Sequence, residues 1–508
     1  MTTNEPVWDL LVVGGGINGA GIAADAAGRG LSVLLCEKGD LAGATSSASS
    51  KLVHGGLRYL EHFEFGLVRK ALAEREVLLA KAPHIIHPLR FVLPHMNTVR
   101  PAWMIRIGLF LYDHLARHPR LPNSHGVNLR EDPTGAPLQA ALSKGFVYSD
   151  CWVDDARLVV CNAMAAAERG ADIRTRTELV EARRHGGLWQ ARLHDHADGS
   201  TITVAARALV NAAGPWVESL LHGPLALQDT EGVRLVKGSH IVAPRLFEGA
   251  HAYILQHTDR RVVFVMPFEG DFSLIGTTDV VLSGAPEEAA IEAAETAYLC
   301  QVVNSYFKAS VQPSDVVWSY TGVRPLFDDE AEDPSAVTRD YVLDLDVREG
   351  TAPLLSVFGG KITTYRQLAE EALAELKPYF PSMGTAWTEG TPLPGGDIEN
   401  EDLQAFAEYL TASYPNLDPA MLAGMARRHG SLVTAIVGEA RQQLDMGQDF
   451  GAGLTAREVD YMITHEWART ADDILWRRSK AGIHMSAEQR AAVAAYIETV
   501  RAPAPDSQ

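Results

Sequence analysis

The sequence predicts an α/β protein with a composite N-terminal region, residues 1–390, and an all-helical C-terminal domain, residues 397–508. Three observations support this division. A short apolar strand, a glycine-rich turn and an Ala-rich helix occupy residues 9–30. Strand-like segments then recur as far as residue 360. Beyond the Pro/Gly-rich segment at 391–396, which reads as a linker, apolar residues follow a helical spacing.

Composition limits the class of protein. With 508 residues, 46% hydrophobic and 21% charged, the chain is expected to be globular with two or three domains. Its net charge of −19 would repel phosphate backbones, so we expect no nucleic-acid partner. Four cysteines without a C-x-x-C pair argue against a metal site and for a reducing cytoplasm. We expect neither a signal peptide nor a membrane-spanning helix.

The first glycine turn, GGGING, contains G-x-G-x-x-G between a strand and a helix. Gly14 permits the tight turn, Gly16 lets backbone N–H groups approach a pyrophosphate, and Gly19 allows close helix–strand packing. Glu37 ends the next strand and is placed to accept hydrogen bonds from a ribose. The turn therefore predicts a bound dinucleotide, and by itself it fits NAD as well as FAD.

Two later features favour FAD. The apolar strand at 206–214 ends in NAAGPW and resembles a second dinucleotide-contacting strand of FAD oxidoreductases. The strand at 353–360 ends in a second glycine turn, FGGKITT, which opens a helix. Free N–H groups and a helix N-terminus there would stabilise negative charge on a flavin. Together with the first turn, these segments predict FAD as the cofactor.

The remaining elements follow from periodicity and composition. Residues 41–60, rich in Ser, Gly and Ala, predict an extended loop running into a helix, and residues 64–82 predict a long helix. Further strands are predicted at 238–244, 261–267 and 272–279.

Several of these segments resemble one family. The stretch ATSSASSKLVHGGLRYL at 44–60 is similar to the signature of FAD-dependent sn-glycerol-3-phosphate dehydrogenases. The same holds, in the same order, for YSDCWVDDARLV, VKGSHIV, IGTTD, GVRPL, TRDY and FGGKITTYR. The resemblance runs from about residue 8 to WRRSKAG at 476–482, and it is closest to the aerobic, membrane-associated, single-subunit branch.

The resemblance implies a fold and a reaction. An FAD-binding Rossmann-like domain would be interleaved with an antiparallel β-sheet substrate cap, before the helical C-terminal domain. The cofactor part would lie mainly in 8–85, 150–220 and 350–385, and the cap mainly in 86–149 and 225–345. The enzyme would oxidise sn-glycerol 3-phosphate to dihydroxyacetone phosphate by hydride transfer to FAD. A membrane quinone would reoxidise the reduced flavin.

A phosphate dianion calls for cations with directional donors, and arginine binds two phosphate oxygens at once. Arg58, Arg324 and Arg339 lie in matching motifs, although pairing with Asp150 or Asp328 would be an alternative role. Through the resemblance we assign Arg58 and Arg339 to the phosphate. Arg324, with Lys361, is placed near the reacting hydroxyl.

Oxidation of an alcohol also needs a proton acceptor. His240 is the first candidate because imidazole titrates near neutral pH. Lys361 is a second candidate for the base, and His54 is expected to contact the flavin. Tyr59 is expected to close the substrate pocket. The residues expected to contact FAD are Gly14, Gly15, Gly16, Ile17, Asn18, Gly19, Glu37, Thr45, Ser46, Ser50, His54, Gly55, Gly214, Gly359, Gly360, Lys361, Ile362 and Thr363.

Residues 85–121 carry five arginines and a single acid in an otherwise acidic chain. Within them, PAWMIRIGLFLYDHL at 101–115 suits a helix lying in the headgroup interface, and a helix buried in the core is the alternative. With the resemblance, this predicts a cytoplasmic protein bound peripherally to the inner face of the membrane. The resemblance also allows a homodimer. A glycerol-3-phosphate oxidase using O₂ and an FAD-dependent amine or amino-acid oxidase are the alternative activities.

Overall fold

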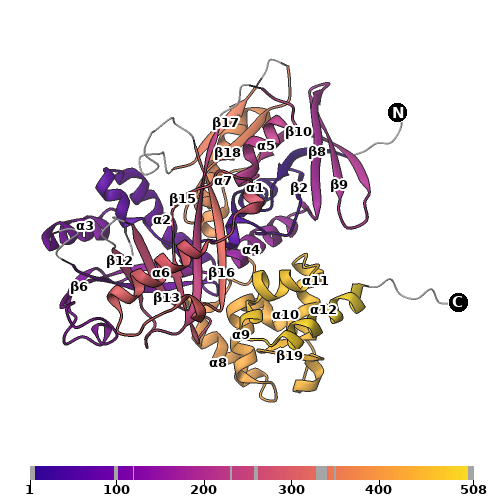
Figure 1. Cartoon of the computed structure of the whole chain (residues 1–508). Helices are drawn as coiled ribbons and strands as arrows, with labels where there is room; N and C mark the ends of the chain where they lie inside the picture. The colour runs from indigo at the N-terminus through magenta and orange to yellow at the C-terminus, as the bar shows by residue number, and fades with distance from the viewer. Residues whose placement is uncertain are drawn as a thin grey trace.

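The computed structural model describes residues 6–96, 101–117, 119–228, 232–256, 261–327, 340–347 and 350–501. Two large β-sheets with their helices form the N-terminal part, and a lobe of helices follows (Figure 1). The predicted fold class, a Rossmann-like domain interleaved with an antiparallel sheet and followed by helices, is confirmed. Residues 391–396 form irregular structure before the C-terminal lobe, and the predicted limits of the domains stay a prediction.

The first sheet is the dinucleotide-binding type. Its central strands are parallel and apolar, as expected of strands that are buried on both faces. An antiparallel edge strand and a hairpin extend it. In sheet order the path is β17 (Val342–Asp346), β18 (Leu354–Phe358), β10 (Thr201–Asn211), β1 (Val7–Val13), β2 (Val33–Glu37) and β7 (Asp172–Thr175), with the hairpin β8 (Thr177–His185) and β9 (Leu188–Asp195).

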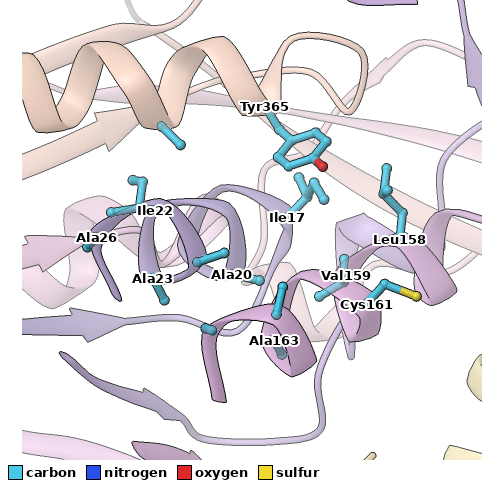
Figure 2. Packing of buried hydrophobic residues seen from close by; sticks show 14 of the residues in the cluster. Ile17, Ala20, Ile22, Ala23, Ala26, Leu158, Val159, Cys161, Ala163 and Tyr365 are labelled. Atoms are coloured by element: carbon cyan, nitrogen blue, oxygen red, sulfur yellow. The ribbon is translucent and has the colours of Figure 1, made fainter. Parts of the chain in front are cut away.

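Helix α1 (Ile17–Gly28) connects β1 to β2 and packs against α4 (Asp155–Ala167) and α7 (Tyr365–Leu376). Figure 2 shows why the three helices lie so close: the α1 side chains between them are mostly alanines. A Cβ atom at Gly21 would lie 2.7 Å from Cδ2 of Tyr365. Small residues therefore fix this helix, and with it the first glycine turn, against the two neighbouring helices.

The second sheet is antiparallel except where β12 pairs with β4. Helix α6 (Ala293–Tyr306) packs on one face, while α2 (Phe65–Lys81) and α3 (Ala102–His114) pack on the other. Helix α2 confirms the predicted helix at 64–82. The strands are β15 (Val280–Val281), β11 (Val233–Pro244), β14 (Phe272–Gly276), β13 (Val262–Phe268), β12 (Ala252–Gln256), β4 (Ile86–Pro94), β6 (Lys144–Val153) and β3 (Leu52–Val53), with β16 (Trp318–Phe327) beside β11 and β5 (His125–Asn128) beside β6.

Two segments differ from the sequence-based expectation. Residues 45–62 form a 3-10 turn η1 (Thr45–Ser47), strand β3 and a second 3-10 helix η2 (Leu57–His62), because β3 pairs with the distant β6. The C-terminal lobe contains a β-hairpin as well as helices. Its elements are α8 (Leu403–Ser413), α9 (Pro419–His429), α10 (Val433–Val437), β19 (Asp449–Gly451), β20 (Leu454–Thr455), α11 (Ala456–His465), the π-helix η12 (Asp473–Arg478) and α12 (Ala487–Arg501). Helix α5 (Val217–His222), preceded by the 3-10 turn η4 (Gly214–Trp216), completes the N-terminal part.

Candidate active site

A cleft of about 1470 Å³ lies between the two sheets and collects most of the predicted site residues. The carboxyl ends of β1, β2, β10 and β18 line it from one side, and β11 and β16 line it from the other. Ligands bind at this edge of open parallel sheets. The predicted residues that line the cleft are Gly14, Gly16, Ile17, Asn18, Glu37, Thr45, Ser46, Ser50, His54, Arg58, Tyr59, Gly214, His240, Arg324, Gly359, Gly360, Lys361, Ile362 and Thr363.

Three predicted cofactor contacts do not line the cleft. Gly15 donates its N–H to Glu37, and Gly19 packs so closely that a Cβ atom there would lie 1.9 Å from the Gly14 carbonyl oxygen. Gly55 donates its N–H to the hydroxyl of Tyr112 at 2.8 Å. These glycines shape the walls, because each needs close backbone approach. Arg339 lies outside the described residues.

The first glycine turn presents the N-terminus of α1 to the cleft. Gly14 has φ of +112°, and a Cβ atom there would lie 2.5 Å from the carbonyl oxygen of Ala212 on the neighbouring strand. Gly16, the N-cap residue, has no side chain to cap the helix, and the N–H of Ile17 donates to Ser46 Oγ at 3.0 Å. A helix N-terminus arranged in this way attracts a phosphate anion.

Glu37 lies beside this turn. Its carboxylate accepts hydrogen bonds from the N–H groups of Gly15 at 2.6 Å and Gly39 at 2.7 Å. Burial raises the pKa of Glu37, and the two backbone donors oppose that rise. The carboxylate is thus held at the rim of the cleft with lone pairs left for a ligand hydroxyl.

The second glycine turn meets the first. Gly359 and Gly360 have φ of +76° and +94°, and a Cβ atom at Gly360 would lie 2.6 Å from Asn18 Nδ2. Asn18 donates to the carbonyl of Gly359 at 3.1 Å, while its Oδ1 is buried with no hydrogen-bond partner among the residues that the structure describes. The N–H of His54 donates to Thr363 Oγ1 at 3.2 Å. Two turns that are 341 residues apart therefore form one wall.

His240 occupies the middle of β11. The strand register places Gly276 of β14 on one side of it and Tyr320 of β16 on the other. A Cβ atom at Gly276 would lie 2.0 Å from His240 Cδ2, so glycine is needed to make room for the ring. The imidazole stacks on Tyr320 with centroids 4.9 Å apart, and its Nε2 lies 2.9 Å from Ser50 Oγ.

The electrostatic surroundings keep His240 neutral. The ring is 2% exposed, and burial is the largest cause lowering its pKa well below 6.5. The positive charges of Arg324 and Lys51 lower the pKa further. A neutral imidazole retains one nitrogen lone pair that accepts a proton.

Cations line the same part of the cleft. Lys361 Nζ has no hydrogen-bond partner in the described part of the chain and lies over the Tyr59 ring, 4.1 Å from its centroid. Arg324 pairs with Asp279, and its NH2 group lies 3.4 Å from Thr277 Oγ1. The alternative partner considered for the arginines, Asp150, instead accepts hydrogen bonds from Arg75 and Tyr112, and Asp328 lies outside the described residues.

Two family models match the chain. The model described as "FAD dependent oxidoreductase" covers residues 9–366, and the model described as "C-terminal domain of alpha-glycerophosphate oxidase" covers residues 386–504. A glycerol-3-phosphate dehydrogenase of Pseudomonas aeruginosa is 56% identical over 97% of this chain and 95% of the relative. The chain belongs to the glycerol-3-phosphate dehydrogenase family of FAD-dependent oxidoreductases.

Two further comparisons describe the breadth of this family. A D-erythritol 1-phosphate dehydrogenase of Brucella abortus is 53% identical over 96% of this chain and 97% of the relative. The crystal structure of a glycerol-3-phosphate dehydrogenase from Bacillus halodurans complexed with FAD is 25% identical, with a TM-score of 0.75. That structural match covers 98% of this chain and 95% of the other.

The family model confirms the prediction that the cofactor of this chain is FAD. The cleft fits the group: the N-terminus of α1, with glycine at its N-cap, suits the pyrophosphate, and the Glu37 carboxylate suits a ribose. In the part of the chain that the structure describes, the buried Asn18 Oδ1 and Lys361 Nζ have no hydrogen-bond partner, as expected of groups that meet a ligand. No cluster of three or more potential metal ligands occurs among the described residues.

Several residues that line the cleft were not predicted from the sequence. Thr277 and Asp279 lie in the quoted motif IGTTD, but nothing in the motif showed that the carboxylate pairs with Arg324. Arg261 lines the cleft from the start of β13, and its guanidinium lies over the Tyr298 ring. Arg477 reaches the cleft from the C-terminal lobe, where the sequence singled out no site residue.

Proposed function

We propose that this chain oxidises sn-glycerol 3-phosphate to dihydroxyacetone phosphate with FAD, and that a membrane quinone reoxidises the flavin. The observation that carries the proposal is that the Lys361 ammonium, which has no hydrogen-bond partner among the described residues, lies in the same cleft as the neutral imidazole of His240. This cleft also holds the dinucleotide-binding turn. A phosphorylated alcohol needs both a cation and a proton acceptor next to FAD.

The cations would hold and orient the substrate. Arg58 and Arg339 would bind the phosphate, where a guanidinium can engage two oxygens at once. Lys361 and Arg324 would lie near the C2 hydroxyl, and Tyr59 would close the pocket above Lys361. Arg324 is held by Asp279, while Gly238 gives it space: a Cβ atom at Gly238 would lie 2.5 Å from Arg324 NH2. Positive charge near the hydroxyl favours its loss of a proton.

His240 would accept that proton. FAD supplies the hydride acceptor when bound, so the C2–H electron pair leaves the substrate as the hydroxyl proton moves to the imidazole. Its lowered pKa keeps the imidazole unprotonated at neutral pH, so a nitrogen lone pair is available to the proton. Lys361 is the alternative acceptor, because it lines the same cleft and its Nζ has no hydrogen-bond partner among the described residues.

The test is anaerobic mixing of the oxidised holoenzyme with sn-glycerol 3-phosphate, followed at the visible flavin bands. We expect the bands to bleach within the mixing experiment, and glycerol without phosphate to leave them unchanged. Bands that persist with sn-glycerol 3-phosphate would overturn the substrate assignment and leave the flavoprotein assignment standing. Bleaching by an amine or an amino acid in place of the phosphate ester would favour the amino-acid oxidase alternative.

D-Erythritol 1-phosphate is a second candidate substrate, since one relative at 53% identity carries that activity in its name. Both compounds present a phosphate and a secondary hydroxyl, so the same cations would bind either. Comparing kcat/KM for the two phosphates separates them, because that ratio measures discrimination between competing substrates. A higher ratio for the erythritol ester would replace glycerol 3-phosphate as the substrate.

The electron acceptor is decided by a second assay. We expect the substrate-reduced enzyme to transfer electrons to a water-soluble ubiquinone analogue faster than to O₂. Hydrogen peroxide formed in amounts equal to the substrate consumed, with no quinone reduction, would identify a glycerol-3-phosphate oxidase instead.

Helix α3 supports peripheral attachment to the membrane. One face packs into the protein through Ile105, Leu109 and Tyr112. The opposite face exposes large apolar side chains: Trp103 is 64%, Met104 45%, Ile107 52% and Phe110 53% exposed. This arrangement differs from a helix buried all round, and it suits a helix whose outer face enters the headgroup region.

Flanking groups extend this apolar face. Phe63, 79% exposed, follows η2 and packs edge-on to Phe65 at 6.2 Å. Of the predicted basic residues, Arg120 pairs with Glu401 at 2.8 Å and therefore carries less free charge than expected. No helix in the described part of the chain is long and apolar enough to cross a bilayer. The outer face of α3 is the proposed contact with the cytoplasmic leaflet.

Vesicle sedimentation tests this contact. Trp103→Glu combined with Phe110→Glu should greatly reduce binding to vesicles of zwitterionic and anionic lipids, while flavin bleaching by substrate stays intact. Leu444→Glu is the matched control, because Leu444 is 80% exposed in the C-terminal lobe, which lies on the other side of the molecule from α3 (Figure 1). Equal binding by the double variant and the wild type would place the anchor elsewhere.

A further inference from the structure

The π-helix η12 joins the C-terminal lobe to the loop that follows β2. Arg478 of η12 is fully buried, and its two terminal nitrogens lie 2.6 and 2.8 Å from the carboxylate oxygens of Asp40. Arg477 Nε lies 2.6 Å from the same carboxylate. Asp40 is 2% exposed, so one buried carboxylate is held by two arginines from the far end of the chain.

A second carboxylate completes the network. Asp473, at the start of η12, accepts two hydrogen bonds from Arg176, both at 2.8 Å, and also pairs with Arg477. The backbone N–H of Arg176 donates to the carbonyl of Gly39 at 2.9 Å. The network therefore contacts the loop at two points, the Asp40 carboxylate and the Gly39 carbonyl. Gly39, Asp40, Arg176 and Arg477 all line the cleft.

The loop after β2 is hydrogen-bonded to the groups that are expected to bind the cofactor. Gly39 donates its N–H to Glu37 at 2.7 Å. Ala42, whose φ is +57°, donates its N–H to the carbonyl of Gly15 in the first glycine turn at 3.0 Å. A displacement of Asp40 would thus move both the Glu37 carboxylate and the backbone of the glycine turn.

The paired hydrogen bonds between the arginines and Asp40 are of a kind that orients the two groups. Buried ion pairs add little net stability compared with apolar side chains of the same size. Paired guanidinium–carboxylate hydrogen bonds do fix the relative position and angle of the two groups. Trp476 of the same π-helix also stacks on Trp318 of β16, with centroids 5.0 Å apart, so η12 is anchored to both sheets.

We propose that the C-terminal lobe positions the FAD-binding loop, with Arg478 and Arg477 as positioning residues that act through Asp40. The lobe is then part of the cofactor site. Because Arg478 does not line the cleft, removing it weakens FAD binding without touching any FAD-contacting side chain. The inference rests on the proposed placement of FAD against Glu37 and the first glycine turn, and it is independent of the substrate.

Coupling between binding and position is reciprocal. If Arg478 stabilises the loop conformation that binds FAD, then bound FAD stabilises the loop and, through Asp40, the π-helix. Hydrogen exchange of the η12 amides should therefore slow when FAD is added to the apoprotein. A purely structural salt bridge would leave that exchange unchanged by FAD.

The experiment is a titration of the apoprotein with FAD, followed by flavin fluorescence, for four proteins. We expect Arg478→Met to raise the Kd for FAD at least about tenfold, because it leaves a buried carboxylate incompletely paired. Arg478→Lys keeps the charge and loses the two-pronged geometry, so its Kd should fall between those of Arg478→Met and the wild type. Arg428→Met is the control.

Arg428 matches Arg478 in chemistry but not in place. It makes a two-pronged pair with buried Glu458, at 2.7 and 2.9 Å, entirely inside the C-terminal lobe. Glu458, His429 and Glu466 stand between Arg428 and Arg478. Arg428→Met therefore acts on Asp40 only indirectly, and it should leave the Kd for FAD within about twofold of wild type. An equal rise for Arg428→Met and Arg478→Met would show general destabilisation of the lobe and overturn the proposal.

Asp40→Asn supplies a second test if Arg478→Met folds poorly, and its Kd for FAD should also rise.

The double variant Asp40→Asn/Arg478→Met is a further test. It leaves no charge unpaired, so its FAD affinity should be no worse than that of Arg478→Met alone. An unchanged Kd for Arg478→Met, Arg478→Lys and Asp40→Asn would also overturn the proposal. Failure of the wild-type apoprotein to bind FAD would instead overturn the placement of the cofactor site.

Discussion

Ser50 Oγ lies 2.9 Å from His240 Nε2 and so links the loop after β2 to strand β11 of the other sheet. The two residues are 190 positions apart, and both line the cleft. With Tyr320 stacked on one side and Gly276 opposite, this contact fixes the plane of the imidazole. Each part of this arrangement gives a measurable expectation.

His240→Ala should slow anaerobic flavin reduction by roughly 100-fold or more, because general base catalysis contributes a factor of that size. Binding of dihydroxyacetone phosphate to the oxidised enzyme should change much less. Stopped-flow absorbance measures the first quantity and a product titration the second. Reduction at the wild-type rate would exclude His240 as the base and favour Lys361.

Ser50→Ala should slow the same step about tenfold, which is the effect of losing one hydrogen bond to a group that must be oriented. Ser47→Ala is the control, because the Ser47 hydroxyl donates only to the carbonyl of Ala44 in the same turn. The FAD content of both variants should equal that of the wild type. Equal rates in Ser50→Ala and Ser47→Ala would contradict a role in orienting His240.

Gly276→Ala should displace the His240 ring, because the added Cβ atom would lie 2.0 Å from Cδ2. A shift of about 1 Å at a reacting group is expected to lower the rate of flavin reduction on the order of 100-fold. Gly66→Ala, where no atom lies within 4 Å of the added Cβ, should leave the rate unchanged. A normal rate in both variants would show that the surroundings of Gly276 accommodate the added Cβ atom without displacing the His240 ring.

Tyr59 tests the placement of the Lys361 ammonium over an aromatic ring at 4.1 Å. Tyr59→Leu should raise KM for the phosphorylated substrate by a factor of about 3 to 10, since a partly buried cation–π contact is worth about 0.5–1 kcal/mol or more. Tyr59→Phe keeps the ring and should stay near the wild-type KM. Equal effects in the two variants would assign the role to the phenolic hydroxyl.

His84 predicts an acid-sensitive stability. Burial, followed by the nearby charges of Arg157 and His429, lowers its pKa to about 3. As pH falls below 6.5 the unfolded chain takes up this proton before the folded chain does, so stability is lost from pH 6.5 down to the folded pKa. At pH 5 the loss amounts to about 2 kcal/mol.

His84→Gln removes the titrating group. The fall in the free energy of unfolding between pH 7 and pH 5 should then be about 2 kcal/mol smaller in the variant than in the wild type. Denaturant unfolding at the two pH values measures the difference, in which other groups cancel. An identical fall in both proteins would mean that the folded protein accepts the proton at His84.

Much of the fold followed from local sequence. Helix α2 was predicted at 64–82 and found at Phe65–Lys81, because its apolar spacing is a property of the helix itself. The first glycine turn was predicted with equal success, since a positive φ at Gly14 and an apolar strand before it are local requirements. The segment 45–62 was less predictable, because β3 forms only by pairing with β6, about 100 residues later.

The sequence by itself determined the cofactor class and the kinds of side chain available to the site. Strand, glycine turn, helix and acidic residue occur within 30 positions, and their chemistry depends on that spacing alone. Only the tertiary structure decided which groups meet. The pairing of Arg324 with Asp279, the contact of Ser50 with His240 and the grip of Arg478 on Asp40 each join segments 45 to 438 residues apart. Such contacts depend on how the sheets and the C-terminal lobe pack. The type of a side chain does not show which distant residue it will contact.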